Sequence, residues 1–195
     1  MSHAPASTTL VEQLVHLARL GQSGPAAARL SAAQWTALRY FSRANRFSRT
    51  PSAFSEYQST TRGTASQTVK SLVAMGLLER RSNSRDGRSA LIELTEAGRA
   101  MLAEDPMAEL EAVLESLPPE RRRGLAQALS QATETLAERR GAAVFGTCRD
   151  CTHCACLDDE RVFCRSSRTA LDAAEVSALC VDFTPLRETP RAPVR

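Results

Sequence analysis

Apolar side chains recur every three or four residues along most of the chain up to Arg140, a spacing typical of amphipathic helices. Leu10, Leu14 and Leu17 predict a first helix that ends before Gly21. The same spacing predicts further helices over residues 31–43, 51–57, 61–75, 95–104, 105–117 and 120–140.

Polar caps and helix breakers mark where these helices begin and end. Ser31 and Gln34 have the spacing of a capping box, so the second helix begins at Ser31. Thr50 followed by Pro51 places a cap and then a proline at the first helical position. Gly76 tolerates a left-handed backbone and ends the fourth helix.

After the fourth helix the pattern changes to that of β-strands. Leu77 to Arg81 and Ala90 to Leu94 are short strand candidates, and Asp86-Gly87 between them is a hairpin turn signal. The order helix, helix, short helix, helix, hairpin is that of a winged helix-turn-helix. The sequence therefore predicts a mainly α fold with a small β-hairpin wing (α+β), long dimerisation helices and a small C-terminal cysteine-rich module.

The N-terminal half of the fourth helix offers short polar and basic side chains. A helix N-terminus favours phosphate oxygens, and hydroxyl and amide groups can hydrogen-bond to base edges. An arginine of the hairpin tip is expected to reach an adjacent minor groove, held by a neighbouring aspartate. The predicted DNA-binding residues are Arg62, Gly63, Thr64, Ser66, Gln67, Thr68 and Lys70 in the helix and Arg85, Asp86 and Arg88 in the hairpin.

Charge is distributed unevenly along the 195 residues, whose formal net charge is +3. Between Trp35 and Arg99, eleven basic residues stand against five acidic ones, so the rest of the chain is net acidic. A basic middle between acidic flanks suits a phosphate-binding surface, although solvated helix faces give the same pattern. The N-terminus lacks a signal-peptide pattern, and no apolar run approaches the roughly 20 residues of a membrane span. We therefore expect a cytoplasmic protein with no membrane partner.

Four short sequence motifs occur along the chain in an order that is specific as a combination. They are Leu30-Ser-Ala-Ala-Gln34-Trp35-Thr-Ala-Leu38, Thr61-Arg-Gly-Thr-Ala-Ser-Gln-Thr-Val-Lys70-Ser-Leu, Gly76-Leu-Leu-Glu-Arg80, and Asp86-Gly-Arg88-Ser89 leading into Ile92-Glu-Leu-Thr95-Glu-Ala-Gly98-Arg99. Together they resemble the MarR family of bacterial transcription regulators over roughly residues 8–140. One departure is the stretch Ser-Ala-Phe-Ser-Glu-Tyr at 52–57, which replaces the more usual Leu-Ala-x-x-Leu of the third helix.

The resemblance implies a homodimer in which the family's first, fifth and sixth helices interleave between the two subunits. In this chain they correspond to the N-terminal helix (1–30) and the C-terminal helices (100–141). Two recognition helices would then reach successive major grooves of a pseudo-palindromic double-stranded DNA operator. The resemblance also implies that Asp86 and Arg88 are the Asp/Arg pair of the wing. Many relatives bind small phenolic ligands, so a small-molecule effector is a candidate partner. The residues that could line such a pocket have the spacing of plain core: His16, Trp35, Tyr40 and Phe41.

All six cysteines follow residue 147, in the pattern C-x2-C-x2-C-x-C-x7-C-x15-C. In a cytoplasmic protein such a cluster is more often metal-binding or redox-active than a disulfide framework. Four thiolates complete a tetrahedral zinc site or hold an iron–sulfur cluster. The predicted ligands are Cys148, Cys151, Cys164 and Cys180, with Cys154 and Cys156 as alternates.

The identity of the metal follows less directly from the spacing. Three evenly spaced cysteines are typical of ferredoxin-type clusters, but the fourth cysteine does not fit that pattern. Zinc sites more often use two close pairs, and here fifteen residues separate the second pair. We expect an iron–sulfur cluster first, zinc second and metal-free thiols third. His153 is interpreted as a surface histidine.

These observations favour a non-enzymatic dimeric repressor or activator whose DNA affinity responds to the state of the cysteine site. In the first alternative the zinc is purely structural and a separate small molecule is the effector. The second is a thiol oxidoreductase, which lacks its expected βαβ setting. The predicted organisation is an N-terminal dimerisation helix (1–30), a winged-helix domain (31–99), C-terminal dimerisation helices (100–141), a cysteine-rich metal-binding segment (142–184) and a disordered tail (185–195).

Overall fold

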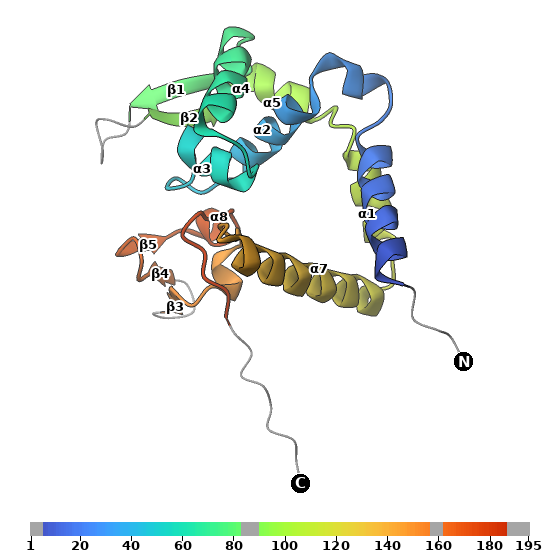
Figure 1. The fold of residues 1–195 in the computed structure, drawn as a ribbon. Coiled ribbons are helices and arrows are strands. Elements are labelled where there is room, and N and C mark those ends of the chain that lie inside the picture. Colours follow the sequence, from blue (N-terminus) through green and yellow to red (C-terminus); the bar gives the residue numbers. More distant parts are fainter. Residues whose placement is uncertain (1–5, 83–89, 157–161, 187–195) are drawn as a thin grey trace.

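The computed structural model describes residues 6–82, 90–156 and 162–186. Figure 1 shows helices α2 to α5 and a two-stranded hairpin gathered into one body, with the long helix α7 running beneath it. The helices are α1 (Ser7–Gly21), α2 (Ala32–Arg43), α3 (Pro51–Tyr57), α4 (Arg62–Ala74), α5 (Glu96–Leu102), α6 (Ala108–Glu115), α7 (Pro119–Arg140) and α8 (Ala173–Val176), with 3₁₀ helices η1 (Pro25–Arg29) and η2 (Cys148–Asp150). The strands are β1 (Leu78–Ser82), β2 (Ala90–Leu94), β3 (Cys154–Cys156), β4 (Val162–Cys164) and β5 (Thr169–Leu171).

The predicted caps form at the starts of α2 and α3, and Thr61 caps α4 in the same way. The hydroxyl of Ser31 accepts a hydrogen bond from the amide of Gln34, and the Gln34 side chain accepts one from the amide of Ser31. Thr50 and Thr61 each accept from the amide three residues ahead. Each cap contributes about 1 kcal/mol to the helix it begins. The predicted order of helices is therefore confirmed, including α3, where the sequence departs from the family pattern.

The wing also forms as predicted. β1 and β2 pair antiparallel, from Leu78 opposite Leu94 to Ser82 opposite Ala90. Thr95 then joins the wing to α5, since its hydroxyl caps the helix and donates to the carbonyl of Gly76 at 2.7 Å. The turn over residues 83–89 lies outside the described residues.

The hydrophobic core belongs to the winged-helix region, which we define as residues 30–102. Tyr40, Phe41 and Phe54 pack with ring centroids 5.1–5.4 Å apart. Val69 and Leu72 of α4 are fully buried against the same cluster. Because α2, α3, α4 and the hairpin all contribute to this core, the orientation of α4 is fixed by packing.

Helices α1, α6 and α7 leave much of their apolar surface exposed. α1 contacts α6 where Gly21 lies against Met107 and Leu110. The 22-residue α7 buries only Ala137, and Gly141 ends it with a left-handed φ of 58°. Within the described ranges, no helix has the length and apolarity that crossing a membrane requires.

Residues 142–186, which we call the cysteine module, form a second small sheet that the sequence did not predict. β3, β4 and β5 are three residues each and pair antiparallel in chain order. The helix α8 begins with a capping box between Asp172 and Glu175, a pattern that is visible in the sequence. Pro185 lies opposite Cys151 in an antiparallel β-bridge, and the amide of Leu186 donates to the carbonyl of Asp150, so ordered structure extends past the predicted boundary at residue 184. The rest of the predicted disordered tail lies outside the described residues.

Candidate DNA-binding helix and cysteine cluster

Helix α4 presents most of the predicted DNA-binding residues to solvent. Ala65, Val69 and Leu72 bury one side of the helix in the core, so its other side faces outward. Of the predicted residues in this helix, Ser66 and Thr68 are half-buried, while Arg62, Gly63, Thr64, Gln67 and Lys70 are exposed.

Two of the polar side chains are partly engaged within the helix. The hydroxyl of Thr68 donates to the carbonyl of Thr64 at 3.1 Å, and the hydroxyls of Thr61 and Thr64 are 2.9 Å apart. Gln67 and Lys70 have no such bond within the described residues. The structure therefore favours Gln67 over Thr68 as the side chain available to a base edge.

Several arginines of the basic middle are neutralised by nearby acids. Arg81 contacts Glu79 at 2.7 Å and Glu93 at 3.0 Å. Arg62 and Lys70, by contrast, form no ion pair with any residue that the structure describes. These basic side chains of α4 therefore indicate a phosphate-binding surface better than the excess of basic over acidic residues between Trp35 and Arg99 does.

The three hairpin residues predicted to contact DNA remain predictions. Arg85, Asp86 and Arg88 lie outside the described residues. The strands that lead to them are described, and they carry the chain outward from the core beside α4, as Figure 1 shows.

The cysteines of the module come together from separate segments. The amide of Cys151 donates to the carbonyl of Cys148 at 3.3 Å, within the turn of η2. Cys154 and Cys164 are directly opposite each other on β3 and β4, a register that places Cβ atoms about 5 Å apart. Cys180 pairs with Gly146, whose carbonyl accepts its amide at 3.0 Å.

Burial controls the protonation of the Cys148 thiol. Cys148, Cys151 and Cys180 are each at most 8% exposed. Burial, together with the neighbouring thiols of Cys180, Cys154, Cys164 and Cys151 in decreasing order, raises the pKa of Cys148 to about 12. The thiol is therefore neutral at physiological pH, and a bound cation would reverse that preference by stabilising the thiolate.

The donor set has the chemistry of a soft-metal site. Cys148, Cys151, Cys164 and Cys180 carry free thiols. The amide of Ser167 donates a hydrogen bond of 3.5 Å to Sγ of Cys164. These residues therefore fit a zinc ion or an iron–sulfur cluster in ligand type.

The thiols do not yet stand in a ligand arrangement. Across residues 6–82, 90–156 and 162–186, no three Cys, His, Asp or Glu side chains are placed where they could hold a metal ion. Metal binding would require the thiols to move closer together. Nε2 of the half-buried His153 lies 3.2 Å from the hydroxyl of Thr184. The side chain of Cys156 is outside the described part of the structure.

Contacts that the sequence did not predict join the cysteine module to the winged-helix core. Phe145 packs edge-on against Tyr40 of α2 and Tyr57 of α3, with centroids 6.2 and 5.2 Å apart. Arg46, between these helices, forms a 2.9 Å ion pair with Glu175 of α8. The module is thus docked on the connection between α2 and α3 (Figure 1). In the sequence, this contact is marked by Phe145 alone, an apolar residue in a stretch that has neither helical nor strand periodicity.

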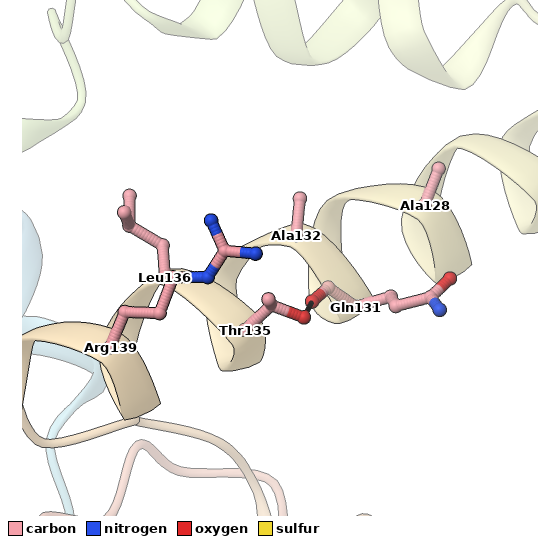
Figure 2. A pocket seen from close by; sticks show the side chains of 6 residues that line it. All are labelled: Ala128, Gln131, Ala132, Thr135, Leu136 and Arg139. Carbon is pink, nitrogen blue, oxygen red and sulfur yellow. Dashed lines mark hydrogen bonds between the residues drawn. The ribbon is translucent and has the colours of Figure 1, made fainter.

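A hollow of about 400 Å³ lies along α7. Figure 2 shows that six side chains of this single helix line it: Ala128, Gln131, Ala132, Thr135, Leu136 and Arg139. One helix cannot enclose a small molecule, so this hollow is an open face rather than a ligand pocket. Of the residues considered from the sequence as a possible pocket lining, Trp35, Tyr40 and Phe41 belong to the core, because they are at most 2% exposed. The fourth, His16, is exposed on α1.

Comparison with known proteins bears on the winged-helix region. Residues 28–89 match the model of the MarR family. This range contains α2, α3, α4 and β1, and it is less than half of the chain. None of the curated proteins compared with the chain matches it.

Solved structures share the fold at low sequence identity. A MarR transcriptional regulator from Methanosarcina mazei Go1 is 22% identical, with a TM-score of 0.54, over 68% of this chain and 99% of its own. MepR from S. aureus, in a complex with DNA, is 18% identical, with a TM-score of 0.54 over the same shares. PcaV from Streptomyces coelicolor, with its natural ligand, is 17% identical, with a TM-score of 0.50 over 69% and 98%. The predicted winged helix-turn-helix fold is therefore confirmed.

Proposed function

We propose that this protein is a transcription regulator that inserts α4 into the major groove of a double-stranded DNA operator. The outer face of α4 carries the proposal, because it is exposed, bears Arg62 and Lys70, and contains no acidic residue. Such a helix contacts phosphates with its basic side chains and base edges with its N-terminal residues. The MarR family match over residues 28–89 and the DNA-bound form of the similar MepR structure support the same function.

We further propose that two copies pair through α1, α6 and α7. Leu10 and Leu14 of α1 are 45% and 48% exposed, and Leu129 and Leu136 of α7 are 40% and 49% exposed. Apolar side chains repeated along one helix face are typical of a surface that a second subunit covers. Pairing two identical subunits about a twofold axis would present two copies of α4 to a pseudo-palindromic operator.

The cysteine module is the proposed source of regulation. Its thiols would hold an iron–sulfur cluster or zinc through Cys148, Cys151, Cys164 and Cys180, with Cys154 and Cys156 as alternates. The support is the convergence of buried thiols from separate segments of a unit fused to the end of α7. A bound metal group would supply a cross-link between these segments. Losing it would free them and shift the two recognition helices relative to each other.

Within this proposal Cys154 is the stronger alternate. Its thiol raises the pKa of Cys148 more than the thiol of Cys151 does, and it lies directly opposite Cys164. A ligand set of Cys148, Cys154, Cys164 and Cys180 therefore competes closely with the set that the spacing favours. Serine substitutions at Cys151 and Cys154 distinguish the two sets by metal content.

The DNA-binding proposal is tested by the salt dependence of operator affinity. Arg62→Ala and Lys70→Ala are each expected to reduce the slope of log affinity against log salt by about 1, as one phosphate contact is lost. The measurement is fluorescence anisotropy with promoter DNA adjacent to the gene. Arg165→Ala, at an exposed arginine of the cysteine module, is the matched control and should leave the slope unchanged. Unchanged slopes in both α4 variants would exclude α4 as the DNA-binding helix.

The metal proposal is tested on protein purified without oxygen. Visible absorption together with matching iron and sulfide contents would support a cluster, and stoichiometric zinc in colourless protein would support a zinc site. The double variant Cys148→Ser/Cys151→Ser should lose the metal and change operator affinity while remaining dimeric. Unchanged operator affinity would indicate that the metal is purely structural. An effector would then be expected to bind at the dimer helices instead.

A further inference from the structure

The C-terminal segment of the cysteine module lies against the turn that leads into the helix-turn-helix. The amide of Leu179 donates to the carbonyl of Arg43 at 2.7 Å, and the amide of Asn45 donates to the carbonyl of Leu179 at 2.9 Å. Two residues on, the amide of Val181 donates to the hydroxyl of Ser48 at 2.9 Å. Cys180, a proposed metal ligand, therefore lies between two residues that are hydrogen-bonded to the end of α2 and to the turn that precedes α3.

Asn45 is the buried residue that holds this turn together beside Cys180. It is buried, with 2% of its surface exposed, and its Oδ1 accepts from the amides of Phe47 and Ser48 and from the Ser48 hydroxyl. Burial raises the pKa of Cys180, while a hydrogen bond from the Asn45 side chain lowers it. Oδ1 already accepts three hydrogen bonds, so Nδ2 is the group of Asn45 that is left to interact with Cys180.

The same turn fixes where α3 begins. The carbonyl of Ser48 accepts from the Tyr40 hydroxyl and from the amide of Thr50, both at 2.7 Å. Thr50 is the N-cap of α3. Helix α3 packs against α4, where Phe54 and Val69 share the buried core. A shift of Ser48 is therefore carried through packed and hydrogen-bonded groups to the proposed recognition helix.

We propose that Asn45 and Ser48 form a junction through which the state of Cys180 sets the position of α3 and, through it, α4. The junction rests on the proposed metal or cluster site in the cysteine module. A metal bound at Cys180 would fix Leu179 and Val181 on either side of it, and their hydrogen bonds would then hold Asn45 and Ser48 in place. Because the polar network is buried, loss of one bond weakens the others rather than being replaced by water. Asn45 and Ser48 are positioning residues and do not contact DNA.

Two substitutions remove the junction while keeping the shape of the turn. Asn45→Asp keeps the acceptor Oδ1 but loses Nδ2, the group left to interact with Cys180. Ser48→Ala removes the acceptor for Val181 and serves as the second variant if the buried aspartate prevents folding. Ser42→Ala is the control, since the exposed Ser42 hydroxyl bonds only to the Arg39 carbonyl of its own helix among the described residues.

The test adds Zn²⁺ alone to reduced, metal-free, full-length protein and follows amide hydrogen exchange over residues 49–58. Zinc is expected to slow exchange about tenfold in the natural protein and in Ser42→Ala, because α3 becomes more firmly held. In Asn45→Asp and Ser48→Ala the slowing is expected to disappear, although zinc binds with unchanged stoichiometry. Equal slowing in the junction variants, or none in the natural protein, would overturn the proposal.

Operator affinity measured on the same samples separates this inference from the regulatory function. Slowed exchange at residues 49–58 with unchanged operator affinity would support the junction and contradict regulation of DNA binding by the module. A change in affinity without slowed exchange there would support regulation and overturn the junction, because the signal would then travel by another route.

Discussion

The winged-helix region and the cysteine module are stabilised in different ways. In the first, Leu38, Phe54 and Val69 are completely buried in one continuous cluster. Among the described residues of the module, the buried apolar side chains are Leu171 and three cysteines, and its strands are three residues long. Burial of apolar surface is sufficient to stabilise the first region, whereas small units with little core depend on a metal, disulfides or docking to a neighbour.

This difference suits a division between reading DNA and sensing a signal. A DNA-binding helix must keep one orientation, which dense packing provides. A sensing unit must change with its ligand, and segments with few buried contacts open at low cost in free energy. The apolar side chains of the module that are near the core, Phe145, Leu179 and Val181, pack against the winged-helix core rather than among themselves. The module is therefore positioned by the region that it is proposed to regulate.

The largest expected effect separates the two cores directly. Phe54→Ala should reduce the free energy of unfolding by about 3–5 kcal/mol, since it leaves a cavity in a fully buried cluster. Phe163→Ala, the matched change on the half-buried β4, should cost about 1 kcal/mol. Urea denaturation followed by circular dichroism measures both. Equal losses would show that the module has a core comparable to that of the winged-helix region.

Two glycines contrast a packed helix with an open one. A Cβ added to Gly98 of α5 would lie 2.1 Å from the carbonyl oxygen of Leu77, so Gly98→Ala should destabilise the protein by about 1–3 kcal/mol. Gly124 on α7 has no atom within 4 Å of such a Cβ. There the alanine should stabilise the helix by up to about 1 kcal/mol. Thermal unfolding of the two variants gives the comparison, and shifts in the same direction would contradict it.

A buried phenol in the winged-helix region makes stability depend on pH. Burial, with smaller contributions from Glu56 and Cys180, raises the pKa of Tyr40 above its ordinary value of 10. The unfolded chain therefore releases this proton first, and the stability that neutral Tyr40 provides is complete below about pH 10 and lost as pH rises above it. Tyr40→Phe should cost about 1 kcal/mol at pH 7, because its bond to Ser48 is lost.

The alkaline range provides the sharper observation for that variant. Phenylalanine does not titrate, so the deficit of Tyr40→Phe should shrink above pH 10 and then change sign. Tyr57→Phe, at a residue that is 39% exposed, is the control and should change stability little at pH 7. Denaturation midpoints from pH 7 to about 11 measure both variants. A deficit that stays constant with pH would contradict the assigned burial of the phenol.

Sequence reasoning was most effective where structure depends on local signals. Ser31, Thr50 and Thr61 are caps recognisable from their neighbours, and the helices they begin were predicted within a residue or two. The outward face of α4 followed from the spacing of its buried residues. The sheet of the module was not predicted, because three-residue strands contain too few positions to show a period.

Contacts between distant segments carry no such local signal. The bonds that join Leu179 and Val181 to the turn near Asn45 connect residues more than 130 positions apart, and each uses a backbone amide that every non-proline residue has. Neither periodicity nor motif spacing reports such a pairing. The sequence predicted the cysteine cluster as a set of ligands, and the structure adds the surface on which that cluster docks.

The smallest expected effect concerns the docking itself. Arg46 pairs with Glu175 of α8 at 2.9 Å and also donates to the carbonyl of Ala170 at 3.0 Å. Since the arginine side chain is 41% exposed, solvent screens the pair, and Arg46→Gln should cost about 0.5 kcal/mol. The loss should appear as faster amide exchange over residues 169–181, with no change in the winged-helix core. Arg43→Gln removes an exposed arginine nearby that forms no ion pair within the described residues. Equal acceleration by that control would show that net charge, rather than the pair with Glu175, holds the module in place.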